Sequence, residues 1–343
     1  ACHLARAEPW SPEWRVLAER NAKLSRRIPP AWTAHLKGRV ISSAFERGFV
    51  GHVTLYSKRF VGEGGRLFDD DPIRTVKFAT LRSTRGSVAP AVLFACPHLA
   101  RVAKLFLDGS ELKDKELTAL AASPHTAGLR MLSLAGHNPF ARSSLPKLLA
   151  ARPGITELGL AANKDVGDAH ARALAESPAL ANLTTLDLAR TGVTAVGVAA
   201  LVGSKHAANL KSLALAPLYD YDEEHGTYFG SVGSRADGLA VAQAFAASTT
   251  LASLEALDLT DRKLGNNGVA ELAQARGLPN LRRLTLAGNV VTKKGMDVLA
   301  KTPLGQRLRF IDVRENDALR PHETEVQEIF PSAYVRVQYD MFL

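Results

Sequence analysis

The sequence is poor in the residue types that mark several protein classes. It has only 2 cysteines in 343 residues, Cys2 and Cys96, which excludes a disulfide framework. No uninterrupted apolar run reaches the length of about 18 residues that would indicate a membrane span. The first residues lack a basic stretch followed by an apolar run, so they do not predict a signal peptide. We therefore expect a cytoplasmic protein, and the absence of an initial Met leads us to expect a truncated or processed start.

Motifs of catalysis and metal binding are also missing. The chain contains no GxxxxGK[ST], HExxH, CxxC or GxSxG sequence. The one close Cys/His pairing is Cys96-Pro97-His98, at a predicted helix end where a small buried cysteine is usual. The carboxylates of Asp220, Asp222 and Glu224 do not have the spacing of a calcium-binding EF-hand loop. We expect no enzyme, no cofactor and no metal site.

Aromatic residues are scarce as well, and the positive charge is unevenly distributed. Aromatics make up 6% of the chain, so alanine and leucine supply most of its 46% hydrophobic residues. The net charge is +9, and residues 1–66 hold 12 Lys and Arg against 5 Asp and Glu. Such a basic segment can attract nucleic acid, acidic proteins or anionic lipid. Simple solubility is the alternative explanation.

The most informative feature that is present is a repeat of the form LxxLxLxxNxL. Eight clear copies begin at residues 102, 129, 155, 183, 210, 254, 281 and 308. The steps are 26 to 28 residues, except for one step of 44, which is one period of 27 plus an insertion of 17. Two weaker copies precede them, around Val53 and Val76. Each copy predicts a strand, a turn and a helix, and one such unit buries its apolar face only when it stacks on its neighbours.

A period of about 27 residues with a full helix resembles the ribonuclease-inhibitor-like class of leucine-rich repeats. The resemblance implies an α/β horseshoe solenoid, with parallel strands on the concave face and helices on the convex face. A second resemblance lies upstream, where Glu46-Arg47-Gly48-Phe49-Val50 leads into Val53-Thr54-Leu55, Leu67-Phe68 and Pro72-Ile73-Arg74. This stretch is similar to the end of the repeat-companion domain of bacterial leucine-rich-repeat proteins. The family usually begins with an acidic, Trp-containing helical segment, which this chain lacks.

The repeats and their flanks predict three regions. Residues 1–49 are expected to form an N-terminal helical cap, a partial companion domain, with Trp14 and Trp32 in its core. Residues 50–320 hold the leucine-rich repeats, with the insertion near residues 219–235. Residues 321–343 are expected to form a C-terminal cap, since a solenoid needs polar ends.

One position of the repeat should carry buried side chains that bond the backbone of the turns. Asn163, Asn289 and Asn316 occupy it, and Ser110 and Thr191 could replace the amide in part. Three copies have residues that do not fit: His137, Leu218 and Arg262. We expect an irregular ladder at those copies.

The insertion is the first candidate binding site. Insertions in repeat proteins map to loops on one face, often the binding face, and tyrosine gives contact area at low entropy cost. Three of the chain's 6 tyrosines lie here. The candidate residues are Tyr219, Asp220, Tyr221, Asp222, Glu223, Tyr228 and Phe229. A flexible surface loop without a partner is the alternative.

The concave face is the second candidate. The residue after the first leucine of each copy forms a basic stripe, and acids gather between the two inner leucines. Cross-strand pairing of these charges is an equally open explanation. Because interface hot spots are often arginine or aromatic, the C-terminal end of this face is favoured. Its candidate residues are Arg282, Arg283, Arg309, Phe310 and Arg314.

The resemblances imply a protein-interaction role and supply no catalytic residues. The leading hypothesis is a monomeric scaffold that binds a protein partner through the concave face and the Tyr/Asp-rich insertion. A nucleic-acid or anionic-surface binder that uses the basic N-terminal segment is the second hypothesis. A regulatory module of a larger protein is the third.

Overall fold

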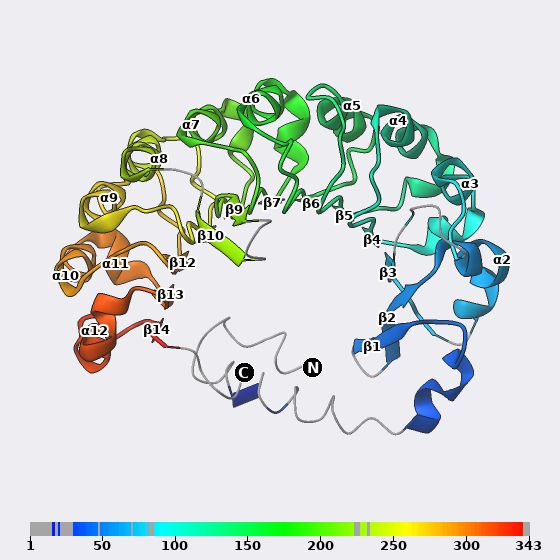
Figure 1. The fold of residues 1–343 in the computed structure, drawn as a ribbon, viewed down its shortest axis with the longest axis horizontal. Helices are drawn as coiled ribbons and strands as arrows, with labels where there is room; N and C mark the ends of the chain where they lie inside the picture. Colours follow the sequence, from blue (N-terminus) through cyan, green and yellow to red (C-terminus); the bar gives the residue numbers. More distant parts are fainter. Residues whose placement is uncertain are drawn as a thin grey trace. The chain divides into compact units, whose positions relative to one another are not determined.

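The chain folds into two compact units, residues 1–159 (unit 1) and residues 160–343 (unit 2). The structure is a computed structural model that describes residues 16–17, 20, 30–46, 49–69, 71–79, 81, 86–222, 227–231 and 234–338. In each unit the strands lie side by side in one layer and the helices in a second layer (Figure 1). The division at residue 159 falls inside the repeats, and the three regions expected from the sequence remain a proposal.

Unit 1 begins with an antiparallel strand pair and continues as parallel repeats. Phe45 and Val50 are partners in the antiparallel pair, whereas every later strand runs parallel to the one before it. Its elements are η1 (Pro30–Leu36), β1 (Ser42–Glu46), β2 (Phe49–Leu55), α2 (Ser57–Leu67), β3 (Thr75–Phe78), α3 (Pro90–Phe94), η2 (Pro97–Arg101), β4 (Lys104–Phe106), α4 (Asp114–Ala122), η3 (Pro124–Thr126), β5 (Met131–Ser133), α5 (Ser144–Ala151) and β6 (Glu157–Gly159).

Unit 2 repeats the same order and contains the insertion. β8 pairs directly with β11 because β9 and β10 form a separate two-stranded sheet. Its elements are α6 (Asp168–Glu176), η4 (Pro178–Asn182), β7 (Thr185–Asp187), α7 (Ala195–Val202), η5 (Lys205–Ala207), β8 (Ser212–Ala214), β9 (Tyr219–Asp222), β10 (Thr227–Ser231), α8 (Arg235–Ala247), β11 (Ala256–Asp258), α9 (Gly265–Leu272), β12 (Arg283–Thr285), α10 (Lys293–Ala300), α11 (Pro303–Arg307), β13 (Phe310–Asp312), η6 (Asp317–His322), α12 (Glu323–Ile329) and β14 (Tyr334–Arg336).

The predicted repeats are confirmed, and the fold is an α/β leucine-rich-repeat solenoid. In the three-residue strands from β4 to β13, the central residue is one of the leucines of the pattern, or Ile311 in the last copy, and each is at most 1% exposed. These residues pair with one another from strand to strand, as Leu257 does with Leu284 and Leu284 with Ile311. Because successive strand residues face opposite sides, one face of each strand lies in the core and the other faces away from it.

The same tight turn follows β4, β5, β6, β7, β11, β12 and β13. The second residue after the second inner leucine adopts a left-handed conformation, with φ between 58° and 67°. Glycine takes that position at Gly109, Gly136 and Gly288, where the conformation carries no steric cost. Side chains are tolerated in the other copies, at Ala162, Arg190, Asp261 and Glu315.

A ladder of buried side chains links the turns of neighbouring repeats. Asn316 Oδ1 accepts a hydrogen bond from Val291 N at 2.8 Å, while its Nδ2 donates to Leu286 O at 2.9 Å. Asn289 makes the equivalent bonds one repeat earlier. At His137 the ladder is shifted by one residue, as the sequence led us to expect, and Asn138 fills the position from one residue further along. Its Oδ1 accepts from Leu112 N at 2.9 Å and its Nδ2 donates to Leu134 O at 2.8 Å.

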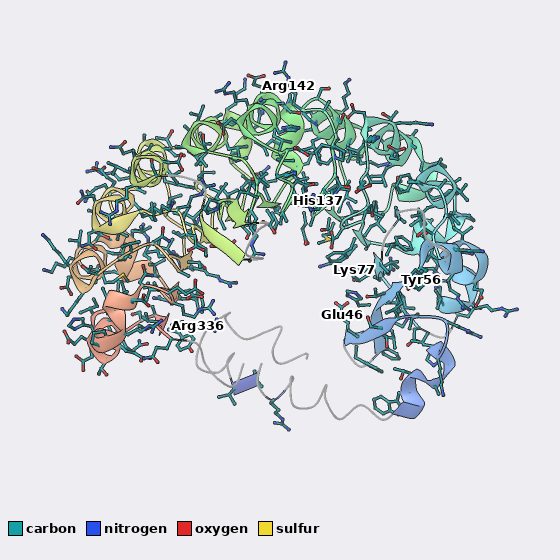
Figure 2. The ribbon with its side chains drawn as sticks, viewed as in Figure 1. Glu46, Tyr56, Lys77, His137, Arg142 and Arg336 are labelled. Carbon is teal, nitrogen blue, oxygen red and sulfur yellow. The ribbon has the colours of Figure 1, made fainter. Side chains whose placement is uncertain are left out.

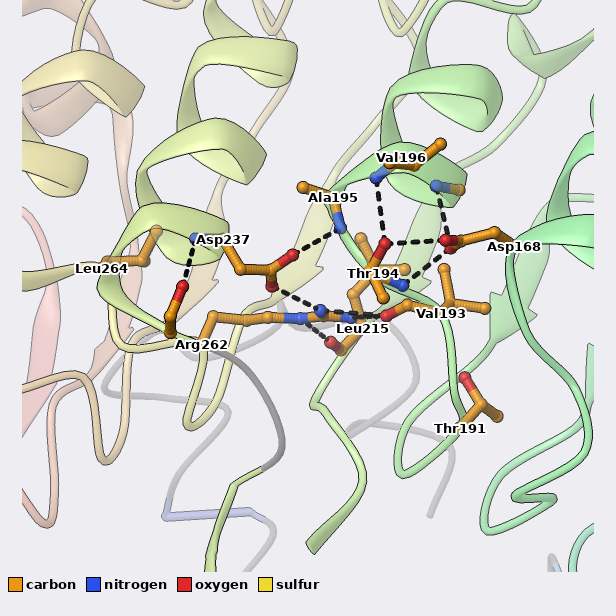
Figure 3. Close-up of polar contacts among 12 residues, drawn as sticks. Asp168, Thr191, Val193, Thr194, Ala195, Val196, Leu215, Asp237, Arg262 and Leu264 are labelled. Atoms are coloured by element: carbon orange, nitrogen blue, oxygen red, sulfur yellow. Dashed lines mark hydrogen bonds and ion pairs between the residues drawn. The ribbon is translucent and has the colours of Figure 1, made fainter.

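Arg262 replaces the ladder amide where the insertion interrupts the repeat. Its guanidinium donates to Leu215 O and, from both terminal nitrogens at 3.1 Å, to Val193 O (Figure 3). The side chain is 1% exposed and lies 3.6 Å from Asp237 Oδ2. Burial lowers the pKa of Arg262, and the carboxylates of Asp237 and Asp168 raise it. Leu218 occupies the ladder position of the preceding repeat but has no side-chain donor, and the long side chain of Arg262 bonds these carbonyls instead.

The first unit begins differently from the prediction. In the segment expected to form the helical cap, residues 16, 17 and 20 are helical and the 3-10 helix η1 follows, and Trp14 lies outside the described residues. Trp32 was expected in the core but is 57% exposed, with its ring centroid 6.1 Å from that of Phe45. The antiparallel strand β1, which the sequence analysis did not predict, forms the edge of the sheet instead. An antiparallel neighbour ends the parallel series at this edge.

Candidate functional site

The strand face of unit 2 is the side of its strands that points away from the buried leucines. Its residues stand immediately before and between the inner leucines, two from each strand. They are Thr185, Asp187, Ser212, Ala214, Ala256, Asp258, Arg283, Thr285, Phe310, Asp312, Tyr334 and Arg336. The basic stripe expected from the sequence lies one residue before each strand, because the first residue after the leucine precedes the strand and is not part of it.

This register separates two of the five predicted residues from the other three. Arg282 Nη1 donates to Pro279 O and Leu281 O, both at 3.1 Å, so the side chain turns toward its own segment. Arg309 donates to Leu308 O at 3.4 Å in the same manner. Arg283 and Phe310 lie on the strand face, and Arg314 lies beside them through its contact with Asp312.

The centre of this group is a nearly buried carboxylate. The side chain of Asp312 is 4% exposed and receives a forked contact from Arg314, whose Nη2 lies 2.7 Å from Asp312 Oδ2. Arg336 Nη1 lies 3.9 Å from the same oxygen. Forked arginine–carboxylate pairs are geometrically fixed, so Asp312 holds Arg314 in one position. We call Arg283, Arg314 and Arg336 the arginine cluster, and Figure 2 labels Arg336.

Aromatic rings form the other half of the group. The guanidinium carbon of Arg283 lies 5.0 Å from the ring centroid of Phe310, a cation–π arrangement. Phe310 was a candidate binding residue of the concave face, but it is 1% exposed, with the ring of Tyr334 at 6.0 Å. Burial lowers the pKa of Arg283, while Asp258 and Asp312 raise it. Phe310 therefore serves as a platform under Arg283.

Tyr334 and Arg336 were missed as site residues. The alternation in Tyr334-Val335-Arg336-Val337 was a signal for their position, since Val335 is buried and pairs with Ile311. These residues lie in β14, which begins 24 residues after β13 and not a full period after it. That shortened step hid the correspondence with the repeats.

The acids of this face also have structural roles. Asp187 Oδ1 accepts a hydrogen bond from Ala189 N, and Asp258 Oδ1 accepts from Thr260 N, both at 2.9 Å. These bonds fix the turn after each strand, in the manner of an Asx-turn. Burial raises the pKa of Asp187, and the charge of Asp258 raises it further.

The insertion contains a β-hairpin in place of an irregular loop. β9 and β10 pair antiparallel, with Tyr221 opposite Tyr228 and Asp220 opposite Phe229. The segment before β9 is anchored by a bridge between Pro217 and Thr191. Glu223 lies outside the described residues. The hairpin leaves the strand face of unit 2 on the side away from the helices (Figure 1).

Unit 1 presents a different strand face. Lys77 Nζ lies 3.5 Å from Asp108 Oδ2, and Lys104 Nζ lies 3.9 Å from Glu157 Oε2. The rings of His52 and Phe106 stack with centroids 6.0 Å apart and planes 29° apart. Burial lowers the pKa of His52, and the charge of Lys77 lowers it further. Lys77 is labelled on this face in Figure 2.

Cys96 is buried, as the sequence predicted. It is 5% exposed, and burial raises the pKa of its thiol, so the reactive thiolate is disfavoured. Among the described residues, no group of three or more His, Cys, Asp or Glu side chains is placed to hold a metal ion. No helix in the same part of the chain has the length and apolar character needed to cross a membrane.

Comparison with known proteins supports the repeat. A family model described as a leucine-rich repeat matches residues 179–202. Among solved structures, the chain is similar to one titled "Crystal structure of Rad7 and Elc1 complex in yeast". The match has 14% identity and a TM-score of 0.39, and covers 96% of this chain and 92% of that one. No curated protein matches the chain. The matched residues lie within the repeats that the strands and the ladder define.

Proposed function

We propose that this chain is a non-catalytic scaffold that binds a protein partner through the arginine cluster and the β9–β10 hairpin of unit 2. The observation that carries the proposal is the arrangement around Phe310, where a buried ring supports Arg283 and a nearly buried carboxylate fixes Arg314. Arginines held in place lose little entropy when they bind, which is the property of interface hot spots.

The test is affinity capture from a cell lysate with the whole chain, at low and at high salt. Deletion of residues 219–233 and the variant Arg283→Ala should each weaken capture, the latter by about tenfold, which is the scale of a hot-spot arginine. Arg320→Ala is the matched control, because Arg320 is 64% exposed and pairs only locally, with Asp317.

Two outcomes would argue against this proposal. One is a partner retained equally by the hairpin deletion and by Arg283→Ala. The other is capture of nucleic acid alone, at low salt only, which would favour a nucleic-acid or anionic-surface binder because such binding falls steeply with salt.

The finer assignments belong to the same proposal. The period of 27 residues and the full helix in each repeat support the ribonuclease-inhibitor-like class. The similarity of residues 46–74 to a repeat-companion domain supports a bacterial source. A monomeric state, a cytoplasmic location and a role as a module of a larger protein are predictions.

A further inference from the structure

The strand face of unit 1 has the composition of a second binding surface. Lys77 on β3 and Lys104 on β4 extend from neighbouring strands, and Phe106 lies between the inner leucines of β4. The two lysine side chains are 44% and 49% exposed. We call Lys77, Lys104, His52 and Phe106 the lysine face.

The lysines of this face are held weakly. Their carboxylate partners, Asp108 and Glu157, are 26% and 38% exposed, and the pairs measure 3.5 and 3.9 Å. Exposed pairs of this kind contribute about 0–1 kcal/mol, so exchange of one carboxylate for another costs little. The forked Asp312–Arg314 pair of unit 2, at 2.7 Å and 4% exposure of the carboxylate, is the opposite case.

The lysines flank an apolar centre. Phe106 is half-buried, His52 stacks on it, and half-buried Met131 occupies the next strand. Lys104 reaches from β4 toward Glu157 on β6, across β5. A ligand on this face would therefore contact a ring and a thioether between two ammonium groups.

The charge of the whole unit favours an acidic ligand. Residues 1–159 contain 24 Lys and Arg against 13 Asp and Glu, a net charge of +11. This field attracts anions over the length scale of the unit and speeds their association. Asp108 and Glu157 stand among the cations, however, and would repel a continuous row of phosphates. Intermittent carboxylates suit this mixture of charges better than a nucleic-acid backbone does.

We propose that the lysine face binds an extended acidic peptide segment of a partner protein. Carboxylates of the segment pair with Lys77 and Lys104, and an apolar side chain between them packs on Phe106 and Met131. The inference rests on the proposed scaffold function in taking a protein as the partner. It uses residues of unit 1 alone and is independent of the arginine cluster.

Fluorescence anisotropy of the whole chain with a labelled peptide tests the inference. The probe is an extended peptide of about ten residues in which every second residue is in turn glutamate, leucine and glutamate, with serine between them, because side chains two positions apart in an extended peptide face the same side. We expect saturable micromolar binding that the double variant Lys77→Ala/Lys104→Ala weakens by about tenfold. Lys205→Ala/Lys211→Ala in unit 2 removes the same charge and should leave the affinity within about twofold.

Three results would overturn the inference. They are no saturable binding, an equal loss in both double variants, or binding of a single-stranded oligonucleotide of the same charge in preference to the peptide. A control peptide with glutamine in place of glutamate should bind the original chain more weakly than the glutamate peptide does. Thermal unfolding of each variant checks that the fold is retained. Because the probe needs no lysate partner, failure here leaves the Arg283→Ala capture experiment unaffected, and the reverse also holds.

Discussion

Units 1 and 2 are built from the same strand, turn and helix, yet their charges differ in sign. Unit 1 carries a net +11, whereas residues 160–343 contain 19 Lys and Arg against 21 Asp and Glu, a net charge of −2. The leucines that define the repeat are buried in both. Charge in a solenoid is therefore set by the positions between the leucines, which the fold leaves free to vary.

The strand faces differ in the same way. Unit 1 uses lysines in loose, exposed pairs, and unit 2 uses arginines fixed by a buried carboxylate and an aromatic ring. A compact, hydrated ammonium on a flexible stem adapts to its partner, and a planar guanidinium prefers one geometry. The lysine face of unit 1 is therefore the more adaptable of the two surfaces, and the arginine cluster of unit 2 is the more fixed one.

The largest expected effect tests how far the stability of unit 2 depends on a charged side chain in its ladder. Arg262→Leu should destabilise the protein by about 3–5 kcal/mol, because it leaves the carbonyls of Val193 and Leu215 without their donor and Asp237 without its cationic partner. Urea unfolding measures this loss.

Arg276→Leu is the control for that variant, since Arg276 is exposed in the same unit. Its free energy of unfolding should change by about 0.5 kcal/mol or less. A loss below about 1 kcal/mol for Arg262→Leu would mean that water replaces the guanidinium at low cost.

A smaller effect is expected from the ladder of unit 1, which is neutral. Asn138→Leu should cost about 2–3 kcal/mol, since Asn138 is 1% exposed and the backbone groups of Leu112 and Leu134 lose their partner. Urea unfolding of the whole chain again provides the measurement.

Ser110 offers a matched comparison in the neighbouring repeat. Its hydroxyl is buried, with no hydrogen-bond partner among the described residues. Ser110→Ala should change the stability by about 1 kcal/mol or less, in the stabilising direction, because it removes an unsatisfied polar group. Equal losses for Asn138→Leu and Ser110→Ala would contradict the ladder as a source of stability.

The smallest effect depends on pH. Burial raises the pKa of Asp187, so its ionisation at neutral pH opposes folding, and its contribution becomes more favourable as the pH falls through the raised pKa. Asp187→Asn should therefore be more stable than the original chain by about 1 kcal/mol or less at about pH 7. The difference in stability should shrink at low pH, where the Asp187 carboxyl is protonated in both the folded and the unfolded chain.

Asp114 in unit 1 should make the stability change with pH in the opposite direction. Hydrogen bonds from Ser144 and the backbone of Ala141 lower the pKa of this exposed carboxyl. Its contribution is present above the ordinary pKa and is lost as the pH falls through the lowered one. Urea unfolding at several pH values should show Asp114→Asn losing stability at neutral pH, and a gain there would contradict the assigned hydrogen bonds.

The strands and most of the ladder could be predicted because leucine spacing encodes them directly. Asn138 was missed because a turn one residue longer moves the amide out of the strict count. The role of Arg262 was missed because its acceptors lie 47 and 69 residues away, and no local pattern carries such a contact. The exposure of Trp32 was missed because composition favours burying tryptophan, whereas its actual neighbour is the edge strand β1.

Only part of the candidate site could be predicted. The sequence identified Arg283 and Arg314 by residue type, and the structure adds Tyr334 and Arg336 from a strand with a shortened period. Arg282 and Arg309 were included among the candidates because each follows the first leucine of its copy, the position assigned to the basic stripe. Alternation within the strand, rather than distance from that leucine, determines which side chains share a face.

The direct pairing of β8 with β11 has a consequence for how this chain can change. Leu213 and Leu257 keep the register of every other neighbouring pair, although the 17-residue insertion enters the chain between their strands. The backbone that leaves β8 and the backbone that returns to α8 tolerate extra length without disturbing the solenoid. This junction is therefore a natural graft point, where new loops can be exchanged and selected while the supporting scaffold stays constant.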